Sequence, residues 1–493
     1  MDPTTTSPSS SRSRDRGFCS VLWAAGAPFT QWLRGPSQRL WQDVLSLVAA
    51  VGSLIVIVTC SAQRGTLAAT TSTPSMDAAA GLEEIHHSTA PSVPSADTNE
   101  RPASESRQVG TSRTAHQDTS PGEYGVDAES DSCFQALRHW RVAMRELAAG
   151  RRSQSVRALW LGDSHTAADF WTNSVRRILE QRVPSGGPGF LALGLEHYRH
   201  GSVRVNSTGS FDVAPHPLSR RSPEGDGVFG LGGIRSRARG SGSSALVRLE
   251  LDPAHEQMAY AMAYRLLDAD DRVEVSWGSQ HRRLQGPQSE KNEFGISHFE
   301  FDGDAADPIE IRALSGQPQL FGIIAETTSP GLVIDTLGIN GARFATMLAW
   351  NSEAWLEEAQ RREPVLAIIA YGTNEIFDAV APEKHAQELQ RIIAQVRSAG
   401  PSVDCLVAGP TDTGRGGPET AMRAAALDQV ERDTARRAGC CYFSPFQLMN
   451  REGGFPAWLA ADPPLAVSDQ VHLTVRGYER LGQALAEILL RGW

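Results

Sequence analysis

The stretch that most constrains the fold is residues 156–166, which reads VRALWLGDSHT. An apolar run of strand length stops at GDSH (162–165), and from Thr166 apolar residues recur at helical spacing. A strand that enters a helix through a tight turn presents the turn at the carboxyl end of a sheet, where open α/β folds bind ligands. Unpaired N–H groups at the helix start are suited to holding an anion. The stretch therefore predicts an α/β fold with Ser164 where a nucleophile would act.

Three later stretches carry further reactive groups, two of them directly after apolar runs. Asp469 lies three residues before His472 in SDQVHLT, so its carboxylate is positioned to orient the imidazole that activates a serine. A buried-strand pattern at 365–371 runs into GTNE, which carries the carboxamide of Asn374. The apolar run 332–337 precedes GINGA, which offers a backbone N–H at Gly341. Each stretch alone has an ordinary structural explanation, such as a helix cap for Asp469.

Taken in order, GDSH, GINGA, GTNE and SDQVHL resemble the four signature blocks of the SGNH, or GDSL-type, hydrolases. This resemblance implies that Ser164 is the nucleophile and that His472 and Asp469 complete the catalytic triad. It also implies an oxyanion hole formed by the N–H of Ser164, the N–H of Gly341 and the side chain of Asn374. The flanking Asp163 and His165 are expected to support the turn by hydrogen bonds.

The residues in and around the four blocks resemble one group within this family more closely. LGDSHTAADFW, LGINGAR, YGTNE and VHLTVRGY are similar to segments of bacterial peptidoglycan O-acetylesterases, which remove acetyl groups from muramic acid. Those enzymes have GDSH in place of GDSL and a β-rich, carbohydrate-binding-like module inserted after the first block. The resemblance covers roughly residues 155–490.

The N-terminal part of the chain has a different character. Residues 1–43 are polar and contain several arginines, and residues 44–61 include an uncharged apolar run near the short end of the spanning range. Arginine on the N-terminal side predicts a cytoplasmic N-terminus, a single-pass signal anchor in the cell membrane, and a catalytic domain on the periplasmic or extracellular side. The alternatives are a lipoprotein attached at Cys60 or a cleaved, secreted protein. Residues 62–130 are rich in Ser, Thr, Ala, Pro and Gly, which predicts a disordered linker.

Strand and helix patterns alternate from residue 332 onward. Repeated βα units predict a parallel sheet with helices on both faces, formed by residues 131–190 and 330–493. The resemblance to SGNH hydrolases implies that this sheet is doubly wound and flavodoxin-like. The predicted strands are 156–161, 332–337, 365–371, 403–408 and 441–445; the predicted helices are 133–147, 342–361, 382–399, 419–438, 475–490 and one that begins at Thr166.

The long gap between Ser164 and Gly341 predicts an inserted domain, because a crossover between parallel strands needs far fewer residues. Within residues 191–329, short apolar or alternating runs separated by glycine-rich turns predict an antiparallel β-sandwich. Its aromatic residues are expected to lie mainly in the core, with stacking on sugar rings as the alternative. The predicted strands are 245–251, 258–266, 272–277, 298–301, 309–313 and 320–327.

Composition excludes some partners and cofactors. The net charge of −10 and the lack of a basic run with interleaved aromatic residues argue against nucleic-acid binding. The sequence has no CxxC pair, so a zinc site is not supported. We predict no metal site and no cofactor. Cys405 is expected to pair with Cys440 or Cys441, and buried free thiols are the alternative.

These observations predict a serine esterase that removes O-acetyl groups from a cell-envelope polysaccharide, peptidoglycan above all, through an acetyl-enzyme. One alternative is another SGNH esterase: a polysaccharide deacetylase, lipase or thioesterase. The absence of a long apolar lid in the sequence disfavours a lipase. An O-acetyltransferase and a non-catalytic wall-binding protein are further alternatives.

Overall fold

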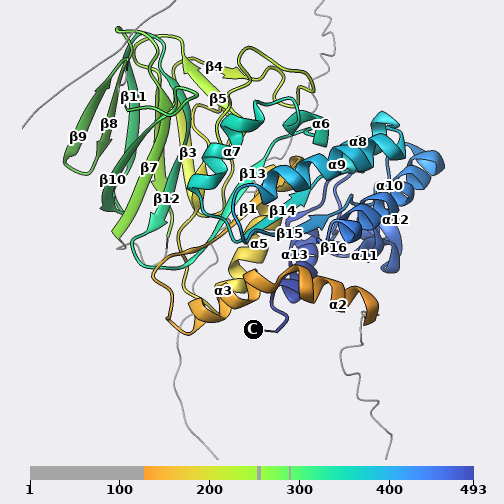
Figure 1. Ribbon diagram of the computed structural model, residues 1–493. Helices are drawn as coiled ribbons and strands as arrows, with labels where there is room; N and C mark the ends of the chain where they lie inside the picture. The colour runs from red at the N-terminus through yellow and green to blue at the C-terminus, as the bar shows by residue number, and fades with distance from the viewer. Residues whose placement is uncertain (1–126, 252–256, 288–289, 493) are drawn as a thin grey trace, which may run out of the picture. The chain divides into compact units, whose positions relative to one another are not determined.

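The structure is a computed structural model that describes residues 127–251, 257–287 and 290–492 (Figure 1). The predicted N-terminal segment 1–43, the predicted membrane segment 44–61 and nearly all of the predicted linker 62–130 lie outside these ranges. Helix α2 (Asp127–Ala136) begins slightly before the predicted end of that linker. None of the helices in the described ranges has the length and apolar character needed to cross a membrane.

A five-stranded parallel sheet forms the centre of the α/β part. Its spatial order is β13-β1-β14-β15-β16. Of these strands, β1 comes first along the chain and β13 second; β13 pairs with one edge of β1, and β14, β15 and β16 follow in order from its other edge. This is the flavodoxin-like order, and the predicted parallel sheet is confirmed. Gly162 pairs with both Gly338 and Ala370, so three strand ends lie level at the carboxyl edge. The strands are β1 (Val156–Gly162), β13 (Leu332–Gly338), β14 (Leu366–Ala370), β15 (Asp404–Ala408) and β16 (Cys441–Phe443).

Helices cover both faces of this sheet (Figure 1). The strands are buried on both sides, and successive residues such as Ile368 and Ile369 enter different cores. One core includes residues of α3 (Arg138–Ala148), α5 (Phe170–Leu179), α11 (Pro445–Arg451), α12 (Gly454–Ala460) and α13 (Val475–Leu489). The other includes residues of α6 (Phe344–Met347), α7 (Ser352–Arg361), α9 (Pro382–Arg397) and α10 (Gly417–Arg437).

Several predicted helices are interrupted. The helix expected from Thr166 is divided into α4 (Ser164–Ala167) and α5, with Asp169 between them in the left-handed region at φ 56°. The helix expected over 342–361 is divided into α6 and α7, and the Asn351 side chain caps α7 by accepting from the Ala354 N–H. Residues 133–147 belong to α2 and α3 rather than to one helix. The short helices α8 (Thr373–Asp378), α11 and α12 were not predicted.

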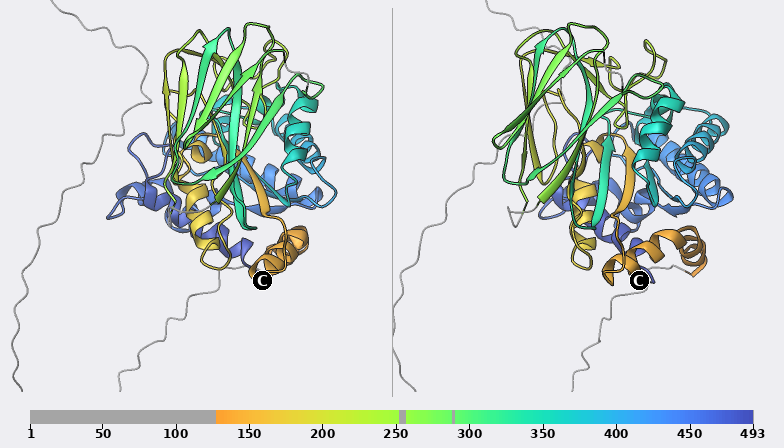
Figure 2. Two further views of the ribbon diagram at one scale, coloured as in Figure 1. Left: turned by 90° about the vertical axis from the view of Figure 1, so that its left-hand side faces the viewer. Right: turned by 60° about the vertical axis from the view of Figure 1, so that its left-hand side comes forward.

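The predicted insert contains two antiparallel sheets, visible in Figures 1 and 2 as the yellow-green to green strands. One has the order β10-β7-β12-β5-β4, with β2 also paired to β12, and the other has the order β3-β6-β11-β8-β9. The strands are β2 (Gly189–Leu191), β3 (Val203–Thr208), β4 (Phe211–Ala214), β5 (Arg235–Ala238), β6 (Ser244–Leu249), β7 (Gln257–Arg265), β8 (Arg272–Trp277), β9 (Gln280–Gln285), β10 (Ser297–Asp304), β11 (Ile309–Ser315) and β12 (Gln319–Thr327).

Both sheets contribute to a single apolar core, so the insert is a sandwich as predicted. Tyr260, Tyr264 and Trp277 are buried in this core, as expected of the aromatic residues, whereas Tyr198, Phe211 and Phe299 are half-buried and pack against it. The predicted strands all correspond to observed ones. Polar strands such as β9, which reads QHRRLQ and is largely exposed, were missed because they lack an apolar face.

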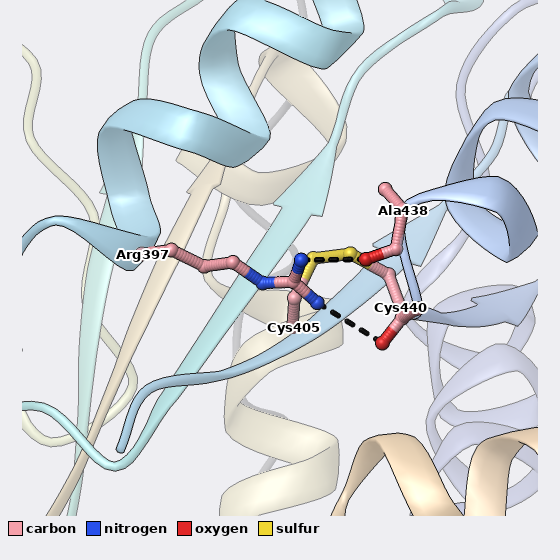
Figure 3. The surroundings of a disulfide bond; sticks show 5 residues. Arg397, Cys405, Ala438 and Cys440 are labelled. Carbon is pink, nitrogen blue, oxygen red and sulfur yellow. Dashed lines mark hydrogen bonds between the residues drawn. A yellow bond between two sulfur atoms is a disulfide. The ribbon is translucent and has the colours of Figure 1, made fainter. Parts of the chain in front are cut away.

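Two disulfide bonds join elements of the α/β part. Cys405 of β15 is bonded to Cys440, one of the two partners left open by the sequence (Figure 3). Beside this bond, Arg397 donates hydrogen bonds to the carbonyl oxygens of Ala438, at 2.5 Å, and Gly439, at 3.0 Å. The second bond, Cys133–Cys441, links α2 to β16 and was not predicted.

Candidate active site

Ser164 lies at the start of α4, directly after the carboxyl end of β1. The preceding turn is tight: a Cβ on Gly162 would come within 2.8 Å of the Ala370 carbonyl oxygen, so the position requires glycine. The carboxylate of Asp163 caps α4 by accepting from the His165 N–H at 2.9 Å. The hydroxyl of Ser164 is thus held at the sheet edge, as the sequence predicted.

The structure brings His472 and Asp469 to this hydroxyl. His472 Nε2 lies 2.9 Å from Ser164 Oγ, and its Nδ1 lies 2.6 Å from Asp469 Oδ2. The His472 and Asp469 side chains are 40% and 46% exposed, so substrate and water have access to them. The three side chains form one hydrogen-bonded chain, which is the geometry that lets an imidazole take a proton from a serine hydroxyl.

Backbone contacts fix the loop that carries Asp469 and His472. Asp469 Oδ1 accepts from the Val471 and His472 N–H groups, both at 2.9 Å. Burial alone would raise the pKa of Asp469, but the hydrogen bonds from the backbone and ring of His472 outweigh it and keep the pKa below its usual value. The carboxylate therefore stays ionised beside the imidazole.

Gln470, between the two, adopts a left-handed conformation with φ 65°. Its carbonyl oxygen accepts from the Gly414 N–H at 3.0 Å and from Thr413 Oγ1 at 2.8 Å. The loop after β15 therefore stabilises the turn that presents His472. No local pattern in the sequence predicts this contact.

Two backbone donors are free at the same edge. Within the described residues, nothing accepts a hydrogen bond from the N–H of Gly341 or from that of Ser164. Gly341 has φ 75°, a left-handed conformation that favours glycine. Free, fixed N–H groups beside a nucleophile are the feature that stabilises a tetrahedral oxyanion.

Asn374 lies near these donors, on α8 after the end of β14. Its Nδ2 donates to Asp163 Oδ2 at 3.2 Å and to the Ala342 carbonyl oxygen at 3.0 Å. Because a carbonyl oxygen accepts and never donates, the Ala342 contact requires the nitrogen of the amide on this side. The amide thus joins the Ser164 turn to the Gly341 turn.

Asp163 and His165 form hydrogen bonds beneath the surface, as expected of residues that support the turn. Burial raises the pKa of Asp163 to about 7, against the opposing effects of the His165 N–H and the Arg343 charge. His165 lies between the hydroxyl of Tyr478, 3.0 Å from Nδ1, and that of Thr411, 3.3 Å from Nε2. Burial, with a smaller effect from His472, lowers the pKa of His165 to about 3, so this imidazole stays neutral.

Glu375, the last residue of GTNE, has a structural role that the sequence did not reveal. Its buried carboxylate accepts from the Phe344 N–H at 2.9 Å and from the Gly372 N–H at 3.2 Å, and so connects α6 to the end of β14. Burial raises its pKa to about 7.

In the described part of the chain, no group of three or more His, Cys, Asp or Glu residues is arranged to hold a metal ion.

The model of the GDSL-like Lipase/Acylhydrolase family matches residues 312–480, which include Gly341, Asn374, Asp469 and His472. A search of curated protein sequences gave no significant match.

Among solved structures, one described as a peptidoglycan O-acetylesterase in action is similar over 71% of this chain and 95% of its own, with 24% identity and a TM-score of 0.60. TesA matches with 21% identity over 33% of this chain and 79% of its own, with a TM-score of 0.26. The acetyl xylan esterase AlAXEase matches with 13% identity over 32% and 80%, also with a TM-score of 0.26. The first likeness establishes a shared fold. Residues 312–480 are therefore similar to the GDSL-like lipase/acylhydrolase family, also called SGNH hydrolases, and the fold is shared with a solved structure described as a peptidoglycan O-acetylesterase.

Proposed function

We propose that this protein removes O-acetyl groups from a cell-envelope polysaccharide, with peptidoglycan as the main substrate. The observation that carries the proposal is the hydrogen-bonded chain Asp469–His472–Ser164, in which His472 and Ser164 are 308 residues apart in sequence. A carboxylate, an imidazole and a hydroxyl in this order form a serine esterase triad.

In the proposed reaction, His472 Nε2 takes the Ser164 proton while the hydroxyl oxygen attacks the acetyl carbonyl carbon. The tetrahedral oxyanion accepts hydrogen bonds from the N–H groups of Ser164 and Gly341 and from the Asn374 amide, and removal of one such donor costs about 3–4 kcal/mol. Because the Asn374 nitrogen already has two acceptors, the oxyanion shares one of these N–H groups.

The second half of the reaction regenerates the enzyme. Protonated His472 gives its proton to the sugar oxygen, and the deacetylated glycan leaves. His472 then takes a proton from water, the resulting hydroxide attacks the acetyl-enzyme, and acetate leaves as Ser164 regains its proton. Throughout, Asp469 keeps the imidazole in the required tautomer and stabilises its positive charge.

Two lines of support favour peptidoglycan over other acetyl esters. The sequence blocks around the site resemble those of peptidoglycan O-acetylesterases, and the fold, including much of the insert, is shared with a protein described by that name.

We also propose that the segment 44–61 anchors the chain in the membrane and that residues 62–130 let the catalytic part reach the wall. The two disulfides agree with an exported domain, because such bonds persist in oxidising compartments.

The substrate is tested by measuring acetate release from O-acetylated peptidoglycan, acetylated xylan and 4-nitrophenyl acetate. Preferential release from peptidoglycan supports the proposal, whereas equal cleavage of all three indicates a general esterase and no cleavage indicates a binding protein. Transfer of acetyl to a glycan acceptor in place of acetate release indicates an acetyltransferase. Ser164→Ala should release no acetate. Its control is Ser402→Ala, at an exposed serine before β15, which should release acetate as the wild type does.

A further inference from the structure

An arginine connects the Gly341 turn to the helix that carries Asn374. Arg343 Nη1 donates to the Gly341 carbonyl oxygen at 2.6 Å. The same guanidinium binds the carboxylate of Asp378 through Nε and through Nη2, the latter at 2.9 Å from Oδ1. Asp378 is the last residue of α8, so Arg343 restrains two of the proposed oxyanion donors together.

The insert contributes to this connection through residues 219–221, which lie between β4 and β5. Arg221 Nη1 donates to Asp378 Oδ2 at 2.5 Å. The Ser219 carbonyl oxygen accepts from Thr346 Oγ1 at 3.1 Å, and Thr346 Oγ1 accepts in turn from the Arg343 N–H at 3.1 Å.

Ser219 also packs directly against the Gly341 turn. A Cβ placed on Gly341 would lie 3.4 Å from both Cβ and Oγ of Ser219. The Gly341 turn is thus held from two sides, by the Arg343 guanidinium and by residues 219–221 of the insert.

These contacts bear on catalysis because an oxyanion donor works only in a fixed orientation. Gly341 has the wide conformational freedom of glycine, and its N–H has no protein acceptor among the described residues. The turn is closed by the Ala342 N–H, which donates to the Ile339 carbonyl oxygen at 3.0 Å, and the Arg343 hydrogen bond to the Gly341 carbonyl oxygen further restrains its orientation. Loss of Arg343 or of its partner Asp378 would remove this further restraint.

We propose that residues 219–221 of the insert position the oxyanion hole, with Arg221 acting through Asp378 and Arg343 on Gly341 and Asn374. This proposal rests on the proposed esterase function. The insert then contributes to kcat for any acetyl ester, and this contribution is separate from glycan binding. Arg221 and Arg343 are positioning residues, since neither contacts the reacting atoms.

The test uses the full-length protein and 4-nitrophenyl acetate as substrate. This ester is too small to need a glycan-binding surface. Arg221 is 52% exposed, so we expect Arg221→Ala to lower kcat by about two- to fivefold, the range of an exposed ion pair, with KM unchanged. Arg343 is 19% exposed and contacts Gly341 directly, so Arg343→Ala should lower kcat by about 100-fold, approaching the loss of one donor.

Arg312→Ala is the matched control. Arg312 is also in the insert, is 50% exposed and pairs with Glu310, yet it lies on β11, outside residues 219–221. Its kcat should equal that of the wild type. In the double variant Arg221→Ala/Arg343→Ala, kcat should equal that of Arg343→Ala alone, because both side chains act through one chain of contacts.

Wild-type activity separates this proposal from the proposed function. If the wild type cleaves neither the aryl acetate nor O-acetylated peptidoglycan, the proposed function itself is wrong. If the wild type is active and Arg221→Ala matches Arg312→Ala on the aryl acetate, the positioning role is wrong, even if cleavage of peptidoglycan declines. Because Arg221 is exposed, its variant decides the question even if Arg343→Ala does not fold.

Discussion

At the residue scale, Asn374 has the most demanding position in the proposed mechanism. Its amide nitrogen donates to Asp163 and to the Ala342 carbonyl, and the proposed oxyanion would be a third acceptor. The side chain therefore both connects two turns and offers a donor to substrate. Its orientation is fixed by these acceptors, which avoids the cost of reorganisation when negative charge develops.

We expect Asn374→Ala to lower kcat by about 10²–10³-fold with little change in KM, because the lost donor acts mainly in the transition state. Steady-state kinetics with O-acetylated peptidoglycan provide the measurement. Asn450→Ala is a suitable control, since Asn450 is exposed and its amide donates to the Phe446 carbonyl oxygen, within α11. A raised KM with unchanged kcat would show instead that Asn374 serves substrate binding.

Three of the predicted residues share one property: each follows an apolar run in the sequence. Ser164, Gly341 and Asn374 stand at strand ends, so the expectation that they meet at one sheet edge followed from the parallel order alone. Arg343 and Glu375 gave no such signal. Their roles depend on backbone groups of distant turns, which a local pattern does not reveal.

At the element scale, the two disulfides join elements whose separations along the chain are very different. Cys133 and Cys441 are 308 residues apart, and Cys405 and Cys440 are 35 residues apart. In the chain-entropy view, a bond that closes a longer loop restricts the unfolded chain more. The bond between α2 and β16 should therefore be the more stabilising one.

We expect Cys133→Ala/Cys441→Ala to reduce the free energy of unfolding by about 2–5 kcal/mol, and by about 2 kcal/mol more than Cys405→Ala/Cys440→Ala. Denaturant titration of the three proteins measures both differences. Equal losses, or a larger loss from the Cys405–Cys440 pair, would show that loop length does not govern their contribution.

The interrupted helix after Ser164 shows why some elements were not predicted. Asp169 separates α4 from α5, and its buried carboxylate accepts from the Gly201 N–H at 2.6 Å and from Thr336 Oγ1 at 2.9 Å. Although burial alone would raise the pKa of Asp169, Arg176 and other donors lower it well below its usual value. The left-handed conformation at Asp169 is thus supported by partners that are distant in sequence, while the local pattern favours a continuous helix.

At the scale of the whole molecule, buried carboxyl groups make stability depend on pH. Burial raises the pKa of Asp163 and of Glu375 to about 7, whereas an unfolded carboxyl has a pKa of about 4. Between these values the folded protein binds more protons than the unfolded one. Since the native state holds the extra protons, this contribution to stability is lost as pH rises from about 4 to about 7.

Glu375→Gln should remove part of this dependence, because the amide does not titrate. We expect the variant's melting temperature to decline less steeply than that of the wild type as pH rises through this window, as measured by calorimetry. Glu363→Gln, at a glutamate that is 63% exposed, should keep the wild-type slope. Parallel curves for Glu375→Gln and wild type would show that Glu375 stays ionised throughout.

The long-range organisation was predictable because an insert leaves the order of strands and motifs intact. The family match spans residues 312–480 and so does not include β1 and Ser164, which precede the sandwich in the chain. The contacts between residues 219–221 and the Gly341 turn were beyond sequence reasoning, because they join a polar segment of the insert to a backbone carbonyl oxygen through intermediate side chains.

The most direct test of the central claim is to trap the acetyl-enzyme. The protein is mixed with 4-nitrophenyl acetate, quenched with acid within the first turnover, and analysed by intact mass and peptide mapping. We predict one added acetyl group on Ser164, and none on Ser164→Ala, which should also release no acetate. An acetyl group on a different residue, or full acetate release by Ser164→Ala, would contradict the account.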